Sequence, residues 1–314
     1  MMCTAWHAAT AYADTPWLAS YSSSDYAEEG RRIAVDKAGN VYIAGIVRPF
    51  NVPDYLILKY DSAGTLLWSQ QLDYAGGWDD LNDMQLDAYG NVYVTGASQI
   101  VSNGAYGVFT IKYDTNGNAV WQQRIDNGQD SHGGRALAID ATGNVYVVGY
   151  VSVPANLATG AEAYSDFLTL KYDANGNLLW QQRHHGIDGQ NIATKIALDG
   201  SGNVIVAGEG QGGASVATFA IDYLTLKYAP DGGLLWAQRY EGSGKVNDVV
   251  RALAVDGTGN IYVAGDSDGY LYSPTLINTN SDIATIKYDP NGKQIWERRE
   301  NGSANLYDYA RGLA

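Results

Sequence analysis

The chain has 314 residues, of which 46% are hydrophobic and 17% charged, and it contains 37 glycines, 24 tyrosines and one cysteine. This apolar content excludes a disordered chain, and 34 acidic against 20 basic residues, a formal net charge of -14, exclude binding along a nucleic-acid backbone. No apolar run approaches the roughly 20 residues of a membrane helix, so we expect no membrane insertion.

The first residues resemble the end of an export signal. Residues 1–13 close with Ala11-Tyr12-Ala13, the small-x-small pattern of a signal-peptidase site. The charged and long apolar regions of a full signal peptide are missing, so we interpret this stretch as the remnant of one; a frayed tail is the alternative. We therefore expect residues 14–314 to be secreted, periplasmic or on the cell surface of a bacterium. Since Cys3 is the only cysteine, that part has no disulfide.

The rest of the chain is a repeat. Its first copy runs from a short apolar segment before Asp36, through Gly39–Gly45 and Asp54–Asp61, to Trp68. Trp17 and the repeat tryptophans stand 51, 53, 59, 56 and 60 residues apart. The five complete copies end at Trp68, Trp121, Trp180, Trp236 and Trp296.

In chain order, each copy predicts four short strands. β-Branched and aromatic residues dominate them, and no segment has the 3.6-residue period of a helix. Asp, Asn and Gly fill the links between strands one and two and between strands three and four, as tight hairpins require. Strand two is apolar at nearly every position, as in residues 145–148, so both of its faces must be covered.

Four-stranded antiparallel sheets covered on both faces pack like blades around an axis. We therefore predict an all-β protein, a β-propeller with five complete repeats and a partial sixth blade from the two termini. Trp17–Tyr21 reads as a fourth strand and Arg311–Ala314 as the start of a first strand. A β-solenoid is disfavoured because the period is too long for one coil turn. We favour a fragment of a longer propeller over an incomplete ring, which would expose sheet faces.

The pattern Asp-x-x-Gly-Asn-Val-Tyr-Val-x-Gly, then Lys-Tyr-Asp-x-x-Gly and Leu-Leu-Trp, resembles the SBBP β-propeller repeat of exported bacterial proteins over residues 17–314. It is more distantly similar to the NHL repeat and to quinoprotein propeller repeats. The resemblance implies a propeller, often within larger surface or secreted proteins, and no settled activity. The fourth copy departs from it, with Ala229 for the turn aspartate and Ile205 for the strand-two tyrosine.

The long, variable links share one face of such a propeller, and this face is where we expect binding. Trp78 lies there beside three acids, an arrangement suited to stacking on a sugar ring while binding its hydroxyls; the alternative is a plug over its own blade. Tyrosines in the other long links, such as Tyr106, add possible platforms. Four arginines precede the innermost strands and predict a polar funnel for a sugar or an acidic group, or else a ring of ion pairs with Glu28, Asp248 and Asp308. The expected ligand-binding residues are Trp78, Asp79, Asp80, Asp83, Arg31, Arg135, Arg251 and Arg311.

Residues that recur in every copy are expected to be structural. The strand-three lysines, such as Lys59, are predicted to pair with a repeat aspartate such as Asp36, and the tryptophans to anchor the core. Nucleotide-binding and zinc-protease patterns are absent, and Gly208–Gly213 matches Gly-x-Gly-x-x-Gly without a following helix. We expect no catalytic residue, no metal site and no cofactor, although acids on the long links leave calcium open.

These observations favour a non-catalytic, exported propeller module that binds a glycan or a protein through its long-loop face. The first alternative is an extracellular polysaccharide lyase or glycosidase that uses Asp79, Asp80 or Asp83 with Glu28 across the channel. The second is a structural spacer in a larger surface protein with further domains.

Overall fold

The computed structural model describes residues 17–22, 26–74, 76–99, 104–156, 158, 162–186, 189–211, 221–242, 247–267, 281–301 and 308–313. These residues form five four-stranded antiparallel sheets and one short 3-10 turn, η1 (Pro49–Asn51). The first and second sheets contain β1 (Ala27–Val35), β2 (Val41–Arg48), β3 (Asp54–Tyr60) and β4 (Leu66–Leu72), then β5 (Asp79–Leu86), β6 (Val92–Gln99), β7 (Tyr106–Tyr113) and β8 (Ala119–Ile125). The third and fourth contain β9 (Ser131–Ile139), β10 (Val145–Val153), β11 (Tyr164–Tyr172) and β12 (Leu178–His184), then β13 (Asn191–Leu198), β14 (Val204–Gln211), β15 (Ile221–Tyr228) and β16 (Leu234–Tyr240). The fifth contains β17 (Val249–Val255), β18 (Ile261–Ser267), β19 (Asp282–Tyr288) and β20 (Gln294–Glu300).

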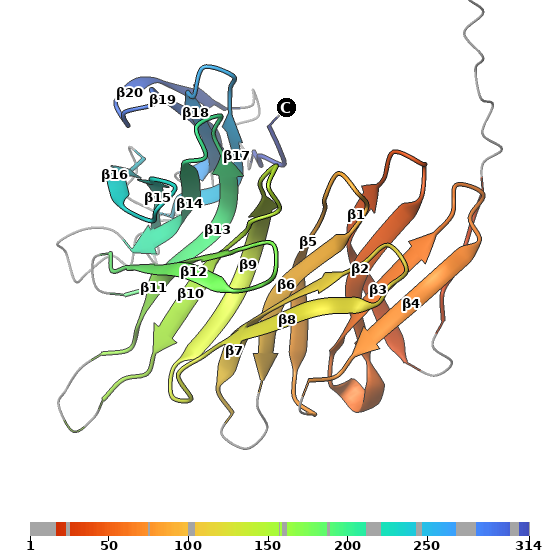
Figure 1. Ribbon diagram of the computed structural model, residues 1–314. Helices are drawn as coiled ribbons and strands as arrows, with labels where there is room; N and C mark the ends of the chain where they lie inside the picture. The colour runs from red at the N-terminus through yellow and green to blue at the C-terminus, as the bar shows by residue number, and fades with distance from the viewer. Residues whose placement is uncertain are drawn as a thin grey trace, which may run out of the picture.

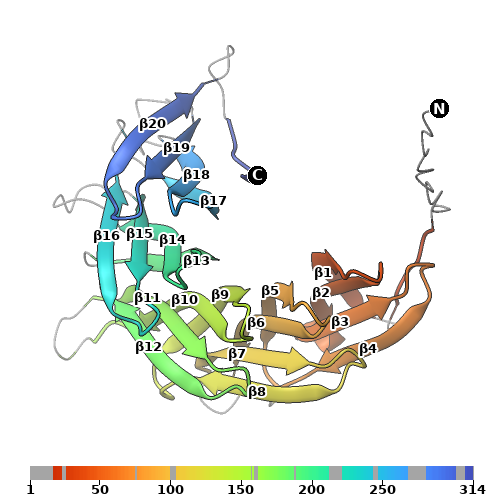
Figure 2. The same ribbon diagram turned by 45° about the horizontal axis from the view of Figure 1, so that its top comes forward.

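The sheets follow one another as blades in an arc (Figures 1 and 2). Within each sheet the strands are paired in chain order, and the first strands β1, β5, β9, β13 and β17 line the concave side, with the fourth strands outermost. Neighbouring blades touch through these first strands. The all-β propeller with four-stranded blades expected from the repeat is confirmed.

The core lies between successive blades. Tyr42, Ile57, Met84 and Phe109, for example, come from the first and second sheets and are almost completely buried in one cluster. Strand two is covered on both faces, as its unbroken apolar pattern predicted.

The repeat tryptophans of the first four blades pack against the next blade. The Trp68 ring lies over Gly117, where an added Cβ would stand 2.9 Å from Trp68 Cδ2, and its Nε1 donates to the Thr115 carbonyl at 3.1 Å. A side chain at this position would also be strained, because the φ of Gly117 is +84°. Equivalent tryptophan Nε1 bonds reach the carbonyls of Ala174, Pro230 and Pro290. The tryptophans are therefore core anchors, as expected.

The lysines of strand three differ from the expectation. Lys59 Nζ donates to the same Thr115 carbonyl at 2.9 Å and lies 5.0 Å from the centre of the Tyr42 ring, rather than pairing with Asp36. Asp36 instead accepts a hydrogen bond from the Tyr42 hydroxyl at 3.0 Å. The expected ion pair occurs in the fourth sheet, where Ile205 replaces the tyrosine: Lys227 Nζ lies 3.0 Å from Asp199.

The described residues that flank the five sheets, 17–22 and 308–313, form no strand, so the strands expected there for a partial sixth blade are not present, although both stretches contact the neighbouring sheet. Trp17 packs on Gly64 of the first sheet as the other tryptophans pack on their glycines. At the other end of the arc, the Asp308 N–H donates to the carbonyl of Ser281, just before β19, and the Ala310 N–H donates to Asp266 Oδ1 in β18. Residues 1–13 lie outside the described part. Within that part, no helix is long and apolar enough to cross a membrane.

Candidate functional site

A β-bulge at one position of every first strand shapes the concave surface. The pairing of first with second strand skips one residue in each sheet: Arg31, Asn82, Arg135, Thr194 and Arg251. A bulge re-aims the side chain that it releases from the ladder. The repeat glycine opposite is required for it; a Cβ on Gly96 would stand 2.1 Å from the Asp80 carbonyl oxygen.

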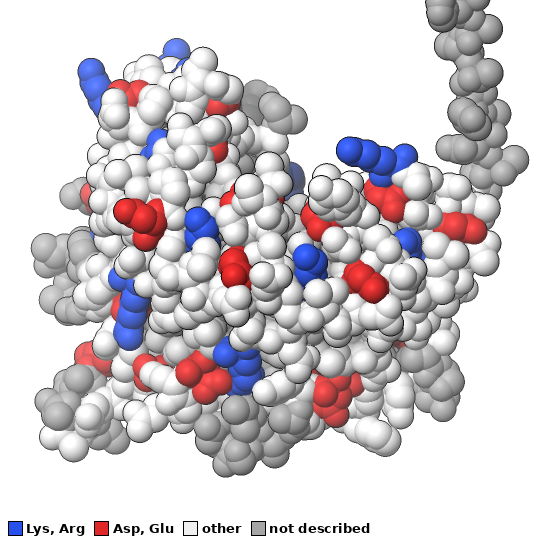
Figure 3. Space-filling model, viewed as in Figure 1, with Lys and Arg blue, Asp and Glu red and all other residues white. Residues whose placement is uncertain are grey.

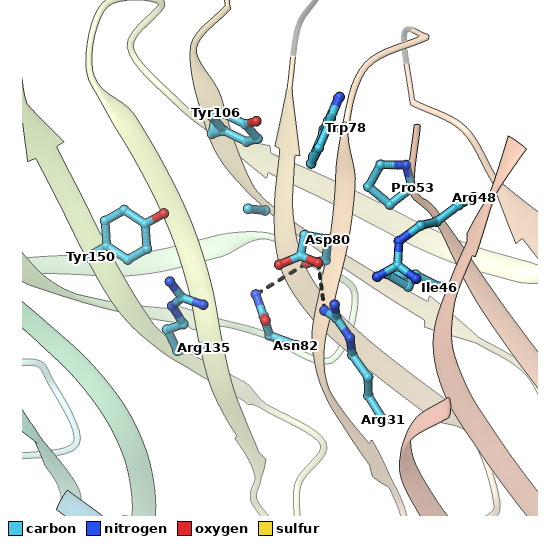
Figure 4. Close-up of a pocket in the computed structure, with 11 residues that line it drawn as sticks. Arg31, Ile46, Arg48, Pro53, Trp78, Asp80, Asn82, Tyr106, Arg135 and Tyr150 are labelled. Carbon is cyan, nitrogen blue, oxygen red and sulfur yellow. Dashed lines mark hydrogen bonds and ion pairs between the residues drawn. The ribbon is translucent and has the colours of Figure 1, made fainter. Parts of the chain in front are cut away.

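A cavity of about 330 Å³ lies over the bulges of the first three blades (Figure 4). Figure 4 shows Trp78 and Tyr106 along one side, Tyr150 with Arg135 on another, and Asp80 between Asn82 and Arg31. Its lining residues are Arg31, Ile46, Arg48, Pro53, Trp78, Asp80, Asn82, Ala97, Tyr106, Arg135 and Tyr150. This volume falls within the usual range for small-ligand pockets, roughly 300–1,000 Å³.

The backbone on both sides of Trp78 is held to neighbouring strands. Its carbonyl accepts from the Gln99 N–H at 2.9 Å, and the next residue, Asp79, donates its N–H to the Pro53 carbonyl at 2.7 Å. The Trp78 side chain is nevertheless 51% exposed and borders the cavity, instead of lying buried over its own blade.

Two of the predicted charged residues form an ion pair at the cavity. Arg31 Nη1 lies 2.6 Å from Asp80 Oδ1, and Arg31 Nε lies 3.0 Å from Glu29 Oε1. Burial opposes the charge on Arg31, but its hydrogen bonds to Asp80 and Glu29 outweigh this and raise its pKa. Arg31 and Asp80 thus largely neutralise each other and present a polar, nearly uncharged edge.

Arg135 is different. Its guanidinium lies 5.2 Å from the centre of the Tyr150 ring, and no carboxylate in the described part of the chain forms an ion pair with it. A partly exposed guanidinium held against an aromatic face keeps its planar donors available for a carboxylate or sulfate.

The other four predicted residues lie elsewhere. Asp79 is fully buried behind Trp78, and burial raises its pKa to about 6. Asp83 is 8% exposed; it accepts the Leu137 N–H and forms a 2.8 Å ion pair with Arg32.

Arg251 and Arg311 belong to the far end of the arc. Arg251 pairs with Asp266 at 2.7 Å, and Arg311 lies over the Tyr309 ring. The ion pairs of Arg31 and Arg251 are therefore made with acids other than the Glu28 and Asp248 that we expected.

The sequence interpretation missed several lining residues. Tyr150 follows the repeat glycine of strand two, where the other copies carry Ile46, Ala97, Glu209 and Asp266. This position varies although the glycine before it is present in all five copies, and that variation was the sequence signal that could have identified Tyr150. Asn82 occupies the bulge position that is an arginine in three other copies. Aligning the copies on their turn aspartates would therefore have placed Asn82 at the cavity.

On the face shown in Figure 3, acidic and basic side chains are interspersed. No broad field of one sign covers this face. Recognition by local contacts fits such a surface better than long-range attraction.

Comparison with known proteins agrees with the repeat. Residues 235–273 match the SBBP family model, a beta-propeller repeat, which confirms the resemblance seen in the sequence. A relative by sequence is an uncharacterized WD repeat-containing protein of Acanthamoeba polyphaga mimivirus, 24% identical over 204 residues; the match covers 50% of this chain and 14% of that protein.

Two of the solved structures that are similar to this chain are a glycosidase and a propeller domain, both at low identity. One is an alpha-L-arabinofuranosidase from Fusarium graminearum, with 10% identity over 87% of this chain and 83% of that chain and a TM-score of 0.48. The other is the beta-propeller domain of the Trilobed protease from Pyrococcus furiosus, with 8% identity over 85% and 70% and a TM-score of 0.46. Similarity at this level is no basis for transferring a function.

Proposed function

We propose that this protein is an exported binding module whose cavity takes a glycan that carries an acidic group. The observation that supports it most is the pairing of an exposed Trp78 with Arg135 across one cavity. The indole face suits the C–H face of a sugar ring, and the guanidinium suits a carboxylate or sulfate on the same or the next sugar. Asp80, Asn82 and the tyrosine hydroxyls supply polar groups for the remaining hydroxyls.

The test is retention of the whole chain on immobilised neutral and acidic polysaccharides, read together with any released oligosaccharide. We expect retention on acidic glycans without release. Trp78→Ala and Arg135→Gln should each weaken binding by about tenfold or more, since hot-spot contacts are worth roughly 2 kcal/mol.

Matched controls come from the chain itself. Tyr89 is 84% exposed in a tight link away from the cavity, and Arg298 lies on the outer strand β20. Tyr89→Ala and Arg298→Gln should bind like the wild type. Equal losses in the controls, or unchanged binding by folded Trp78→Ala and Arg135→Gln, would remove the cavity from the proposal. If the protein is retained on none of the glycans and releases no oligosaccharide, a protein partner or a role as a structural spacer would be favoured.

An enzymatic role is the second candidate, supported by a residue other than the expected acids. Asp80 and Asp83 are held in ion pairs and Asp79 is buried. Glu209, at the strand-two position next to Arg251, has its pKa raised to about 7 by burial, although Arg251, Lys195 and Arg135 favour its charged form. A carboxyl of this pKa suits general acid catalysis at neutral pH. Oligosaccharide release that is lost in Glu209→Gln would establish this role.

A further inference from the structure

Within a blade, strands three and four are joined at the long-loop end by an ion pair that recurs along the chain. In the third, fourth and fifth sheets, an aspartate at or near the start of strand three is bound by the arginine three residues after the repeat tryptophan. These pairs are Asp166 with Arg183, Asp222 with Arg239, and Asp282 with Arg299. In the second sheet Gly107 replaces the aspartate, and Arg124 binds Asp126 instead, at 2.8 Å.

The first sheet breaks this rule. The strand-three aspartate is present as Asp54, but the arginine position holds Gln71, whose Nε2 donates to Asp54 Oδ2 at 2.9 Å. A neutral amide therefore stands where the other blades place a positive charge. Asp54 is only 5% exposed, so little water compensates for the missing guanidinium.

Two more carboxylates converge on this point. Asp73 follows β4, and Asp79 begins β5 of the next blade; one oxygen of each lies within 4.8 Å of the others and of an Asp54 oxygen. Two of the three groups, Asp54 and Asp79, are buried, and Asp73 is exposed at the rim. The nearby Arg124 binds Asp126 through Nε and the Ser98 carbonyl through Nη1; its buried Nη2 has no hydrogen-bond partner among the described residues.

Asp79 also has a buried oxygen that is not satisfied by a hydrogen bond. Its side chain is fully buried, and Oδ2 accepts the Tyr74 N–H at 2.5 Å. Among the described residues, its Oδ1 has no hydrogen-bond donor of ordinary geometry. The neighbouring Ser98 hydroxyl lies near enough to favour the charged form and so lower the pKa of Asp79, but burial outweighs this effect. A buried carboxylate oxygen without a donor is costly, which is why such atoms are nearly always satisfied by a proton donor or a metal ion.

We propose that Asp54, Asp73 and Asp79 bind a calcium ion, which takes the place of the arginine found in the other blades. Hard oxygen ligands are those that calcium prefers, and ligands on opposite sides of it stand about 4.8 Å apart at Ca–O distances of roughly 2.4 Å. The three carboxylates leave further positions for water. This site is separate from the glycan proposal, since it is measured by cation binding alone.

The experiment is a calorimetric titration of the whole chain with CaCl2 after removal of metal with EGTA, together with its melting temperature with and without calcium. We expect one calcium ion per chain, with a dissociation constant of about 1 mM or tighter, as in extracellular calcium modules, and a higher melting temperature at about 5 mM calcium.

Three variants locate the ion. Asp73→Asn changes an exposed residue and should weaken binding by about tenfold or more, since affinity follows the number of charged ligands. Gln71→Arg restores the repeat and should abolish binding while its melting temperature in EGTA is at least that of the wild type. Glu241→Gln changes an exposed acid five residues after Trp236, the position equivalent to Asp73 in the fourth blade, and should bind within about twofold of the wild type.

Two results would overturn the proposal. One is the absence of both heat and a melting shift in the wild type at about 10 mM calcium, well above the weakest modules of this kind. The other is calcium binding by Asp73→Asn and Gln71→Arg that equals the wild type, because the ion would then lie elsewhere. Neither readout depends on glycan binding, so failure here and failure of the glycan proposal are distinguishable.

Discussion

The buried carboxyl of Asp79 should lower the stability of the calcium-free protein at neutral pH. Its pKa rises from the ordinary 3.8 to about 6, mainly because of burial, with smaller contributions from the charges of Asp54 and Asp73. A raised native pKa means that the folded state binds the proton more tightly than the unfolded state. The stabilisation is complete below about pH 4 and is lost as the pH rises through about 6. About two pKa units at roughly 1.4 kcal/mol each amount to about 3 kcal/mol.

Asp79→Asn removes the charge and keeps an acceptor for the Tyr74 N–H. In EGTA at about pH 8, we expect it to raise the free energy of unfolding by up to about 3 kcal/mol, reduced by about 1 kcal/mol if the new amide finds no acceptor. At about pH 3.5 the variant and the wild type should be nearly equal, since both are neutral there.

The assay is urea denaturation of both proteins at the two pH values, compared where the m value is unchanged. Asp73→Asn, at the exposed member of the same cluster, serves as the control and should show a much smaller pH-dependent difference. An Asp79→Asn protein that is less stable than the wild type at about pH 8, or that differs equally at both pH values, would refute the reasoning.

Two further predictions concern the repeat. Gly176 has a φ of +86°, and a Cβ there would stand 2.7 Å from Trp121 Cδ2. Gly176→Ala should therefore lower the free energy of unfolding by about 2 kcal/mol or more. The control is Gly200→Ala, which places its Cβ in open space and should change the free energy of unfolding by less than about 1 kcal/mol. Tyr146→Phe removes the 3.0 Å bond to Asp140 and should cost about 1 kcal/mol in urea denaturation; no loss would show that this hydroxyl bond does not stabilise the blade.

Most of the fold could be predicted because every strand and turn recurs in five copies of the repeat. The alternation in each copy specifies four strands, and the unbroken apolar run of strand two requires a cover on both faces. The tryptophans and turn glycines follow from the same repetition. The lysines were misjudged because a single copy does not reveal that the acceptor of Lys59 is a carbonyl of the next blade.

The site could be predicted only in part. Trp78, Arg31 and Arg135 were found because they depart from the repeat or mark its innermost strand. Contacts across blades depend on bulges and on the angle between sheets, neither of which is visible in a linear pattern. For this reason Asp79 was placed in the pocket beside Trp78, whereas it points behind it toward Asp54.

The docking of each tryptophan on the following blade has a consequence for synthesis. The carbonyls that receive the indole N–H groups lie 47, 53, 50 and 54 residues further along the chain. At about 5–20 residues per second, a ribosome needs roughly 3–10 s to deliver each partner. At each stage of synthesis, the outer strand made most recently therefore carries a tryptophan that is not yet covered. We expect a chaperone to bind at this strand until the next blade has been made.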